Sequence, residues 1–272
     1  AVPKEKRQKF SQLMKKRGVE ATVIGKFNDS GKCEVYYDEK KIMDVEMKFL
    51  HDGVPKKQLK TVFPLLVIKK PPIDKTGNET EKLLALLKSL NITSFEFITQ
   101  QYDHMVQGSL VLSPLQGKGL VNGDTAIIKP VLNSPKGVVM SYGLYPACHS
   151  VAFTIDTAVR NVIAAGANPE KIALLDNFCW SDSNNPKSLG ALKQFVKECH
   201  DRALYYKTPF ISGKDSMFND FCGFDKDGKP LNISIPYTLL ISSLGIIDDV
   251  SKAVSLDIKF PGDLIYIVEN LQ

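Results

Sequence analysis

The feature that most constrains the fold is an alternation of helical and strand patterns in the second half of the chain. It consists of a helix, a strand, a second helix and a second strand, over residues 151–165, 171–175, 186–204 and 209–212. Apolar residues spaced three and four apart predict amphipathic helices, and short apolar runs bounded by turn residues predict buried strands. This order is typical of a sheet that is covered by helices.

Further strand patterns lie on both sides of this alternation. They cover residues 110–112, 125–130 and 137–142 before it, and residues 233–247 and 264–268 after it. A turn pattern at residues 225–230 predicts a hairpin. This order, in which strands are followed by helices alternating with strands and then by further strands, predicts an α+β or mixed α/β fold for residues 109–262.

The first hundred residues have a different organisation. Residues 1–17 form a basic amphipathic pattern that Gly18 ends, and strand patterns follow at residues 21–27, 33–37 and 41–45. The first two strands enclose the turn sequence 28–31, which predicts a hairpin. We expect a small α/β unit over residues 1–70, then a helical connection over 71–108 with helices at 78–90 and 93–100, the second capped by Thr93.

Composition excludes several classes of protein. The 272 residues are 43% hydrophobic and 24% charged, which is typical of globular proteins, and no apolar run approaches about 18 residues, so no membrane span is expected. The net charge of +5 is concentrated in the first seventy residues without interleaved aromatics, so nucleic-acid binding is not expected. The five cysteines are scattered without a C-x-x-C pair, which predicts neither a zinc site nor disulfides and fits a reducing, cytoplasmic location.

Two predicted strands are followed by polar residues that suit ligand chemistry. The first strand is followed by Asp176, and the second opens the stretch Pro209–Asp220, in which Gly213, Lys214, Asp215 and Ser216 come in succession. We expect the chain to turn at Gly213, where the missing Cβ lets a ligand approach. If the strands are neighbours, Asp176 and Asp215 lie on one rim, where α/β proteins bind ligands.

Oxygen donors of this kind suit Mg²⁺ better than zinc. Asp176 and Asp215, with the amide oxygen of Asn161, would form a hard oxygen site, and such a metal usually arrives with nucleotide phosphates. Lys214 would then provide a point charge to a phosphate and Ser216 a hydrogen-bond donor. Structural interpretations also stay open. Asp176 could be a cap, and Trp180, Cys179 and His104 could be structural residues.

Four blocks of sequence together resemble the phosphoribosylformylglycinamidine synthase family of purine biosynthesis. They are QYDHMVQG at 101–108, AVRNVIAAGANP at 158–169, ALLDNFCW at 173–180 and PFISGKDSMFN at 209–219. Their order matches the family over residues 95–268, and Gly262–Ile265 fits the start of that family's next domain. The resemblance implies a fold like the N-terminal domain of aminoimidazole ribonucleotide synthetase.

The resemblance also implies a domain organisation and roles for single residues. Residues 1–70 would be the tail of a preceding synthetase C-terminal-type domain, residues 109–262 an ATP- and Mg-binding N-terminal-type domain, and residues 263–272 the start of a truncated domain. Asp176 and Gly213 match ATP-contacting positions, and Asp215 and Asn161 match Mg²⁺ ligands. Ser216 matches a substrate- or phosphate-contacting serine, and Lys214 is grouped with it.

The activity implied is an ATP-dependent amide-to-amidine ligation. In this family formylglycinamide ribonucleotide, ATP and glutamine give formylglycinamidine ribonucleotide, ADP, phosphate and glutamate, with ATP and Mg²⁺ as cofactors. The implied partners are a glutaminase subunit or domain, a small bridging subunit and the remaining half of the same chain, with no nucleic acid and no membrane. We expect a piece of this kind to be inactive alone.

The sequence departs from the family pattern at three places. Thr157 stands where a metal-binding glutamate is expected, with Asp156 beside it, Lys214–Asp215 resembles only one branch of the family, and the segment 143–153 is short. Two alternatives stay open. The chain could be a structural repeat domain that holds an auxiliary nucleotide, or a related synthetase or selenophosphate synthetase-like kinase.

Overall fold

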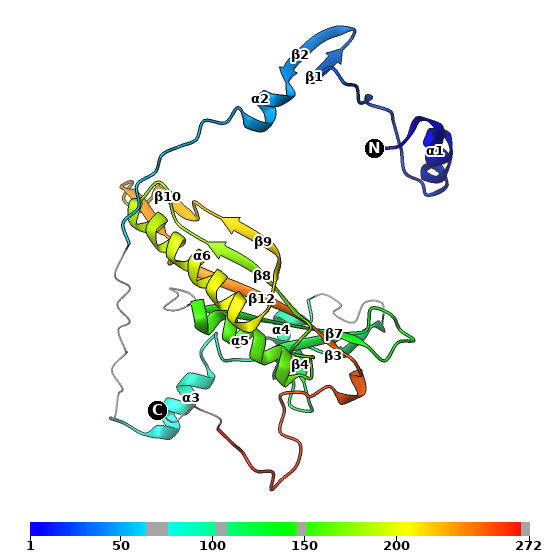
Figure 1. The fold of residues 1–272 in the computed structure, drawn as a ribbon. Coiled ribbons are helices and arrows are strands. Elements are labelled where there is room, and N and C mark those ends of the chain that lie inside the picture. The colour runs from blue at the N-terminus through cyan, green and yellow to red at the C-terminus, as the bar shows by residue number, and fades with distance from the viewer. Residues whose placement is uncertain (64–75, 102–107, 146–150, 268–272) are drawn as a thin grey trace. The chain divides into compact units, whose positions relative to one another are not determined.

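The computed structural model describes residues 1–63, 76–101, 108–145 and 151–267, and they fall into two compact units, Ala1–Gln58 and Leu59–Gln272 (Figure 1). The expected boundary at residues 70–71, His104 and part of the short segment 143–153 lie outside these residues. The domain boundaries expected from the sequence stay predictions. Among the described residues, no helix has the length and apolar character needed to cross a bilayer.

The first unit contains short helices and one β-hairpin. Its elements are η1 (Lys4–Lys6), α1 (Arg7–Lys16), β1 (Lys32–Tyr37), β2 (Lys40–Glu46) and α2 (Met47–Asp52). The basic helix is confirmed, and it ends before Gly18, whose φ is +68°. The strand predicted at 21–27 is wrong, because β1 pairs with β2 and the turn falls at Asp38 and Glu39, both with positive φ.

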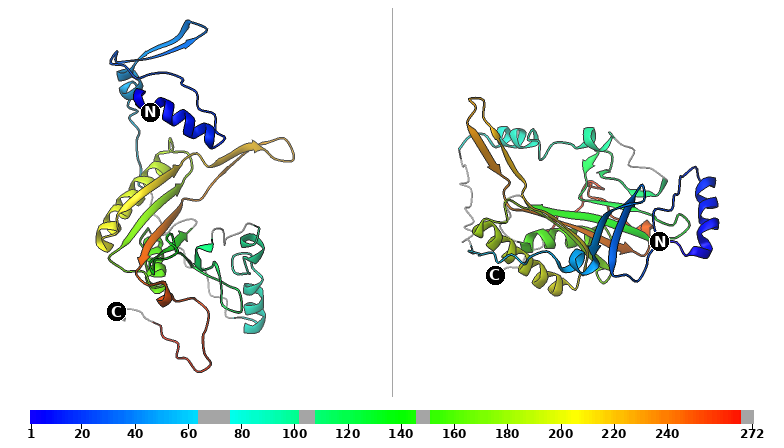
Figure 2. Two further views of the ribbon diagram at one scale, coloured as in Figure 1. Left: turned by 90° about the vertical axis from the view of Figure 1, so that its right-hand side faces the viewer. Right: turned by 90° about the horizontal axis from the view of Figure 1, so that it is seen from above.

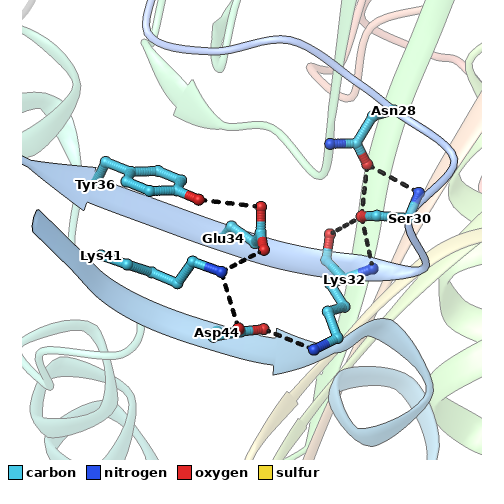
Figure 3. A network of polar contacts seen from close by, with 7 residues as sticks. All are labelled: Asn28, Ser30, Lys32, Glu34, Tyr36, Lys41 and Asp44. Carbon is cyan, nitrogen blue, oxygen red and sulfur yellow. Dashed lines mark hydrogen bonds and ion pairs between the residues drawn. The ribbon is translucent and has the colours of Figure 1, made fainter. Parts of the chain in front are cut away.

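Polar contacts join this hairpin and the segment before it. Lys41 Nζ lies 2.6 Å from Glu34 Oε1 and 3.0 Å from Asp44 Oδ2, so one ammonium group bridges the two strands (Figure 3). The predicted turn at 28–31 is a local loop in which the Ser30 hydroxyl donates to Asn28 Oδ1 at 2.6 Å. All of these groups are partly or fully solvated, so they contribute little to stability.

The second unit begins with helices α3 (Glu79–Leu87) and α4 (Glu96–Thr99). Asn78 caps α3 by accepting a hydrogen bond from the Thr80 amide at 2.8 Å, which confirms the predicted helix start. The cap expected at Thr93 is wrong, because α4 begins after Phe95, whose amide donates to Asn122 Oδ1. Asn122 belongs to the small hairpin of β4 (Leu115–Gln116) and β5 (Val121–Asn122), which the sequence did not indicate.

A six-stranded sheet forms the body of this unit. Its strands, in spatial order, are β3 (Leu110–Leu112), β6 (Thr125–Ile128), β7 (Gly137–Tyr145), β12 (Thr238–Ile247), β8 (Ile172–Cys179) and β9 (Phe210–Ser216). All neighbouring pairs are antiparallel except β8 and β9, which are parallel. The mixed α/β prediction is confirmed.

Helices α5 (Val151–Ala164) and α6 (Pro186–Tyr206) pack on the same face of the sheet (Figure 1). The core lies between them and the strands, where Ile155 and Phe195 meet Leu174 and Ile241, each at most 1% exposed. Asn185 caps α6, and Pro186 occupies its first turn, as the sequence predicts for a helix start. Alternate residues of each central strand therefore face either the helices or the opposite side.

Several strands differ from the prediction. Strands β8 and β9 do not end at residues 175 and 212 but continue to Cys179 and Ser216, because the polar residues of each pair with those of the other. The long strand expected at 233–247 is two strands, β11 (Pro230–Ser234) and β12, and β11 forms a hairpin with β10 (Asp220–Phe224) that extends away from the sheet (Figure 2). Residues 264–267 form no strand.

Candidate functional site

The parallel strands β8 and β9 bring the predicted site residues together. In their register Asp176 lies opposite Gly213, Asn177 opposite Lys214, Phe178 opposite Asp215 and Cys179 opposite Ser216. The sequence left open whether the two strands are neighbours, and the structure pairs them in parallel. Because they are parallel, their carboxyl ends lie at the same edge of the sheet, which is where α/β proteins bind ligands.

The Asp176 carboxylate lies directly over Gly213. A Cβ built on Gly213 would be 2.7 Å from Asp176 Oδ1, closer than a Cβ carbon approaches other heavy atoms in proteins, so the carboxylate occupies the space that a side chain would fill. Gly213 has no positive φ and lies within β9, so the predicted turn at this residue is wrong. The glycine lets the Asp176 carboxylate approach the backbone closely, and it does not change the direction of the chain.

The electrostatic surroundings of Asp176 disfavour its charged form. Burial raises the pKa of the Asp176 carboxyl, the backbone amide of Lys214 donates a hydrogen bond that lowers it, and the charge of Asp215 raises it further. The last effect means that the two carboxylates interact. A cation placed between them would relieve this repulsion and the cost of burying the charge.

The predicted site residues divide between the two faces of the sheet. Phe178 is 4% exposed beneath α6, so alternation places Asp176 and Asp215 on the helix-covered face and Lys214 and Ser216 on the other. On that second face the Ser216 hydroxyl is 3.5 Å from Asn177 Oδ1, the acceptor that also lies 3.8 Å from Cys179 Sγ. Asn177, for which the sequence analysis predicts no role, therefore joins the site through Ser216.

Asn161 lies elsewhere. It is on α5 and lines a hollow of about 250 Å³ with Asp124, Thr125 and Ser255, next to the start of β6. Three strands separate β6 from β9 in the sheet, which at about 4.8 Å per step amounts to roughly 19 Å. Within the described residues Asn161 is therefore not gathered with Asp176 and Asp215, and its role as a Mg²⁺ ligand stays a prediction.

The carboxylate beside Thr157 already has partners. Asp156 accepts hydrogen bonds from the Tyr206 hydroxyl and from Arg160 Nε, the latter at 2.7 Å, and Thr157 Oγ1 lies 3.0 Å from the Tyr145 hydroxyl. These contacts tie the start of α5 to the end of α6 and to β7. The Asp156 carboxylate is thus held by contacts within the fold at the point where the family pattern has a glutamate.

The donor set suits Mg²⁺ in kind but not in number. The two carboxylates on the helix-covered face, those of Asp176 and Asp215, are hard oxygen donors. Among the residues whose placement is described, however, no three histidine, cysteine, aspartate or glutamate side chains gather closely enough to hold a metal ion. Substrate phosphates commonly supply the remaining ligands of Mg²⁺.

Trp180 is a core residue. It is 0% exposed, its ring stacks on Tyr237 with centroids 4.6 Å apart, and its indole N–H donates to the Ser188 carbonyl at 2.9 Å. The structural interpretation of this residue is thereby confirmed. It anchors the segment that follows β8 and so fixes the end of the strand that carries Asp176.

Comparison with known proteins identifies relatives of one kind. The chain is 27% identical over 271 residues to the phosphoribosylformylglycinamidine synthase subunit PurL of Picrophilus torridus, covering 96% of this chain and 34% of that subunit. The corresponding subunit of Thermococcus sibiricus is 29% identical over 275 residues, covering 98% of this chain and 35% of that subunit. No family model matches the chain. The chain thus spans about a third of the length of the curated relatives it matches.

Solved structures of PurL from Thermotoga maritima have the same fold. The structure of the PurLQS assembly has a TM-score of 0.65 at 18% identity, covering 93% of this chain and 38% of that one, and the PurL complex with ADP has a TM-score of 0.57 over the same shares. These likenesses confirm the fold expected from the four sequence blocks. Over nearly its whole length, this chain is similar in sequence and fold to a segment of the PurL subunit of phosphoribosylformylglycinamidine synthase.

Proposed function

We propose that the chain is part of an ATP-dependent ligase that converts formylglycinamide ribonucleotide to formylglycinamidine ribonucleotide in purine biosynthesis, with glutamine as nitrogen donor. The observation that carries the proposal is the parallel register that places Asp176 over Gly213 with Asp215 within electrostatic reach. Sequence similarity to PurL subunits supports it. Solved PurL complexes with ADP, ATP and the substrate abbreviated FGAR agree with this chemistry.

The residues of the site would bind and orient a nucleotide. The carboxylates of Asp215 and Asp176 would hold Mg²⁺ and balance its charge. When bound, Mg²⁺ shields the negative charges of the phosphates. Gly213 lets the strand backbone approach the nucleotide, and Lys214 and Ser216 on the other face would contact phosphate or substrate oxygens. Catalysis of phosphoryl transfer consists mainly of such positioning and charge stabilisation.

The rest of the machinery would come from other parts of the enzyme. The Thermotoga maritima assembly PurLQS contains further subunits beside PurL, and we propose a glutaminase and a small bridging subunit as partners of this chain too. Because the chain spans about a third of its relatives, we expect it to need the remaining part of the synthetase and to be inactive alone. We place the enzyme in the cytoplasm.

Replacing Asp215 by asparagine in the full-length synthetase tests the role of this site. The substitution keeps size and hydrogen bonding but removes the charge proposed to hold Mg²⁺, so we expect kcat to fall by at least about tenfold at an unchanged melting temperature. Asp227→Asn, in the exposed turn between β10 and β11, is the matched control.

The opposite result would favour the second candidate function. If Asp215→Asn lowers the melting temperature and leaves the rate unchanged, the site holds a nucleotide for stability, as in a structural repeat domain. The interaction between Asp176 and Asp215 favours a bound cation in either case, because the cation relieves the repulsion whether the nucleotide turns over or only stabilises the fold. That observation keeps this alternative open.

A further inference from the structure

Residues 254–259 form one wall of the hollow that Asn161 lines. They follow the short helix η3 (Val250–Lys252), in the orange-red part of the ribbon (Figure 1). Ser255 and its neighbours line the hollow on one side, and Asp124, just before β6, lines it together with Asn161 on α5. The hollow is therefore partly enclosed by a segment that belongs to no helix or strand, which we call the strap.

A buried glutamine on β4 holds the strap in place. Gln116 is 2% exposed, which is unusual for this residue type, so its amide group needs partners within the fold. Its Oε1 accepts a hydrogen bond from the Leu256 amide at 2.6 Å, and its Nε2 donates to the Thr125 carbonyl at 2.9 Å. Leu256 and Thr125 both line the hollow, so one side chain joins two of its walls.

The residue after Gln116 holds the strap at a second point. Gly117 has a φ of +66°, and a Cβ built on it would overlap the Asp257 side chain, so Asp257 occupies the space that a side chain would fill. Lys259 Nζ lies 2.7 Å from Asp257 Oδ1 and donates a hydrogen bond to the Ser255 hydroxyl oxygen at 2.7 Å. Because these polar contacts join the strap residues to one another, we expect the strap to move as one piece.

The strap buries few apolar atoms. Its apolar side chains, those of Val254, Leu256 and Ile258, are 53%, 56% and 83% exposed. Ala253, directly before the strap, packs against the hydrophobic core. Local opening costs least where few apolar contacts are lost, so the strap can detach from Ala253 onward by breaking hydrogen bonds alone.

We propose that the strap is a lid that opens and closes over the hollow at Asn161, with Gln116 as its latch and Ala253 as its hinge. The structure holds the closed form, in which Gln116 bonds to the Leu256 amide. The open form uncovers Asn161 and Asp124, so the strap controls the entry of small polar molecules into the hollow. The proposal does not rest on the ligase function, because the latch and the exposed strap exist whatever reaction the whole enzyme performs.

Hydrogen exchange of the full chain, followed by NMR, tests whether the strap opens by itself. The Val254 amide is the reporter, because it donates to the Ala165 carbonyl at 3.2 Å and this bond does not involve Gln116. At low urea concentrations its exchange rate is expected to stay constant while the rates of the β12 amides rise, because local opening exposes little surface. A Val254 rate that follows the β12 rates at every urea concentration would overturn the proposal.

Gln116→Met tests the latch. Methionine has a similar length and flexibility, and it removes both hydrogen bonds of the Gln116 amide group. We expect the exchange rate of Val254 to rise at least about tenfold more than the rates of the β12 amides, because the strap opens more often. Equal rises would mean that Gln116 stabilises the whole fold, and no rise at Val254 would mean that Gln116 does not hold the strap. Either result overturns the proposal.

Gly117→Ala releases the strap by a different route. Gly228→Ala is the matched control, because Gly228 has a φ of +76° in an exposed turn and a Cβ there would meet no atom within 4 Å. Both variants strain the backbone, but only Gly117→Ala displaces Asp257. Relative to the β12 amides, Val254 exchange should rise at least about fivefold in Gly117→Ala and stay within about twofold in Gly228→Ala. Equal effects of the two variants would contradict the second hold on the strap.

Access to the hollow is measured at the side-chain amide of Asn161. A neutral, soluble nitroxide broadens the NMR signals of groups that it can approach. In Gln116→Met the Asn161 signals should broaden at least about twofold more than in the original chain, while those of Asn28, exposed in the first unit, should broaden equally in both. If Val254 exchanges faster in this variant and the Asn161 broadening is unchanged, the strap does not close the hollow and the proposal fails.

Discussion

At the scale of single residues, the site depends on a missing side chain. The Asp176 carboxylate fills the space above Gly213 and accepts a hydrogen bond from the Lys214 amide. This arrangement could not be read from the sequence, because a glycine after an apolar run equally well predicts a turn. The sequence did indicate that Asp176 and the run Gly213–Lys214–Asp215 could form one site, because residues of these types bind anions and metals.

Gly213→Ala is expected to displace the Asp176 carboxylate. The added Cβ would stand 2.7 Å from Asp176 Oδ1, and because that side chain can rotate away, the free energy of unfolding should change by no more than about 1 kcal/mol. Burial is the largest effect on the pKa of Asp176 and raises it despite the Lys214 hydrogen bond, so displacing the carboxylate from this position should let that pKa fall towards its ordinary value. Carboxyl NMR titration measures it, with Gly25→Ala, which meets no neighbouring atom, as control. An unchanged pKa would contradict this account.

The stabilisation that comes from the contact between Tyr206 and Asp156 should be lost at high pH. Burial and the hydrogen bond to Asp156 raise the pKa of Tyr206 to about 12 from its ordinary value of 10.0. A raised pKa in the folded state means that the stabilisation is complete below about pH 10 and is lost as the pH rises towards 12. The stability difference between the original chain and Tyr206→Phe, from urea unfolding, should therefore shrink over this range. Tyr205→Phe, at an exposed neighbour, should show no such trend.

At the scale of elements, amphipathic patterns predicted the helices well and the strand ends poorly. Helices α3, α5 and α6 begin within one residue of the predicted positions, because caps and apolar spacing act locally. The ends of β8 and β9 depend on each other across α6, so nothing near Asp176 or Asp215 in the sequence indicates that these residues are still in strands.

Trp180 should stabilise the end of β8 more than any other single side chain there. It is fully buried and contacts the rings of Phe178, Phe195 and Tyr237. Trp180→Ala would leave a large cavity and an unpaired Ser188 carbonyl, so a loss of about 3–5 kcal/mol is expected. Because this is the chain's single tryptophan, unfolding must be followed by circular dichroism. A loss below about 1 kcal/mol would show that the segment after β8 is not anchored by this ring.

At the scale of the whole molecule, the sheet is covered by helices on one face. On the other face, strands β7 and β12 present Met140, Leu240 and Leu244, which are only partly buried, and Tyr142, which is 48% exposed. A partly exposed apolar face of this kind is typical of a surface that packs against another protein surface. The separation of Asn161 from Asp215 also belongs to this scale, since Mg²⁺ binds its ligands at about 2.0–2.1 Å and one ion cannot contact both residues in this arrangement.

The parallel pairing of β8 and β9 also determines when the site can exist. Asp176 and Gly213 stand on either side of α6 in the chain, and parallel strands can meet only after the connecting helix has crossed over and docked. Every partly folded form in which α6 is undocked therefore lacks the site altogether. Binding of a ligand that contacts both strands therefore shows that folding is complete. In a refolding experiment, this binding should begin later than the formation of α6 itself.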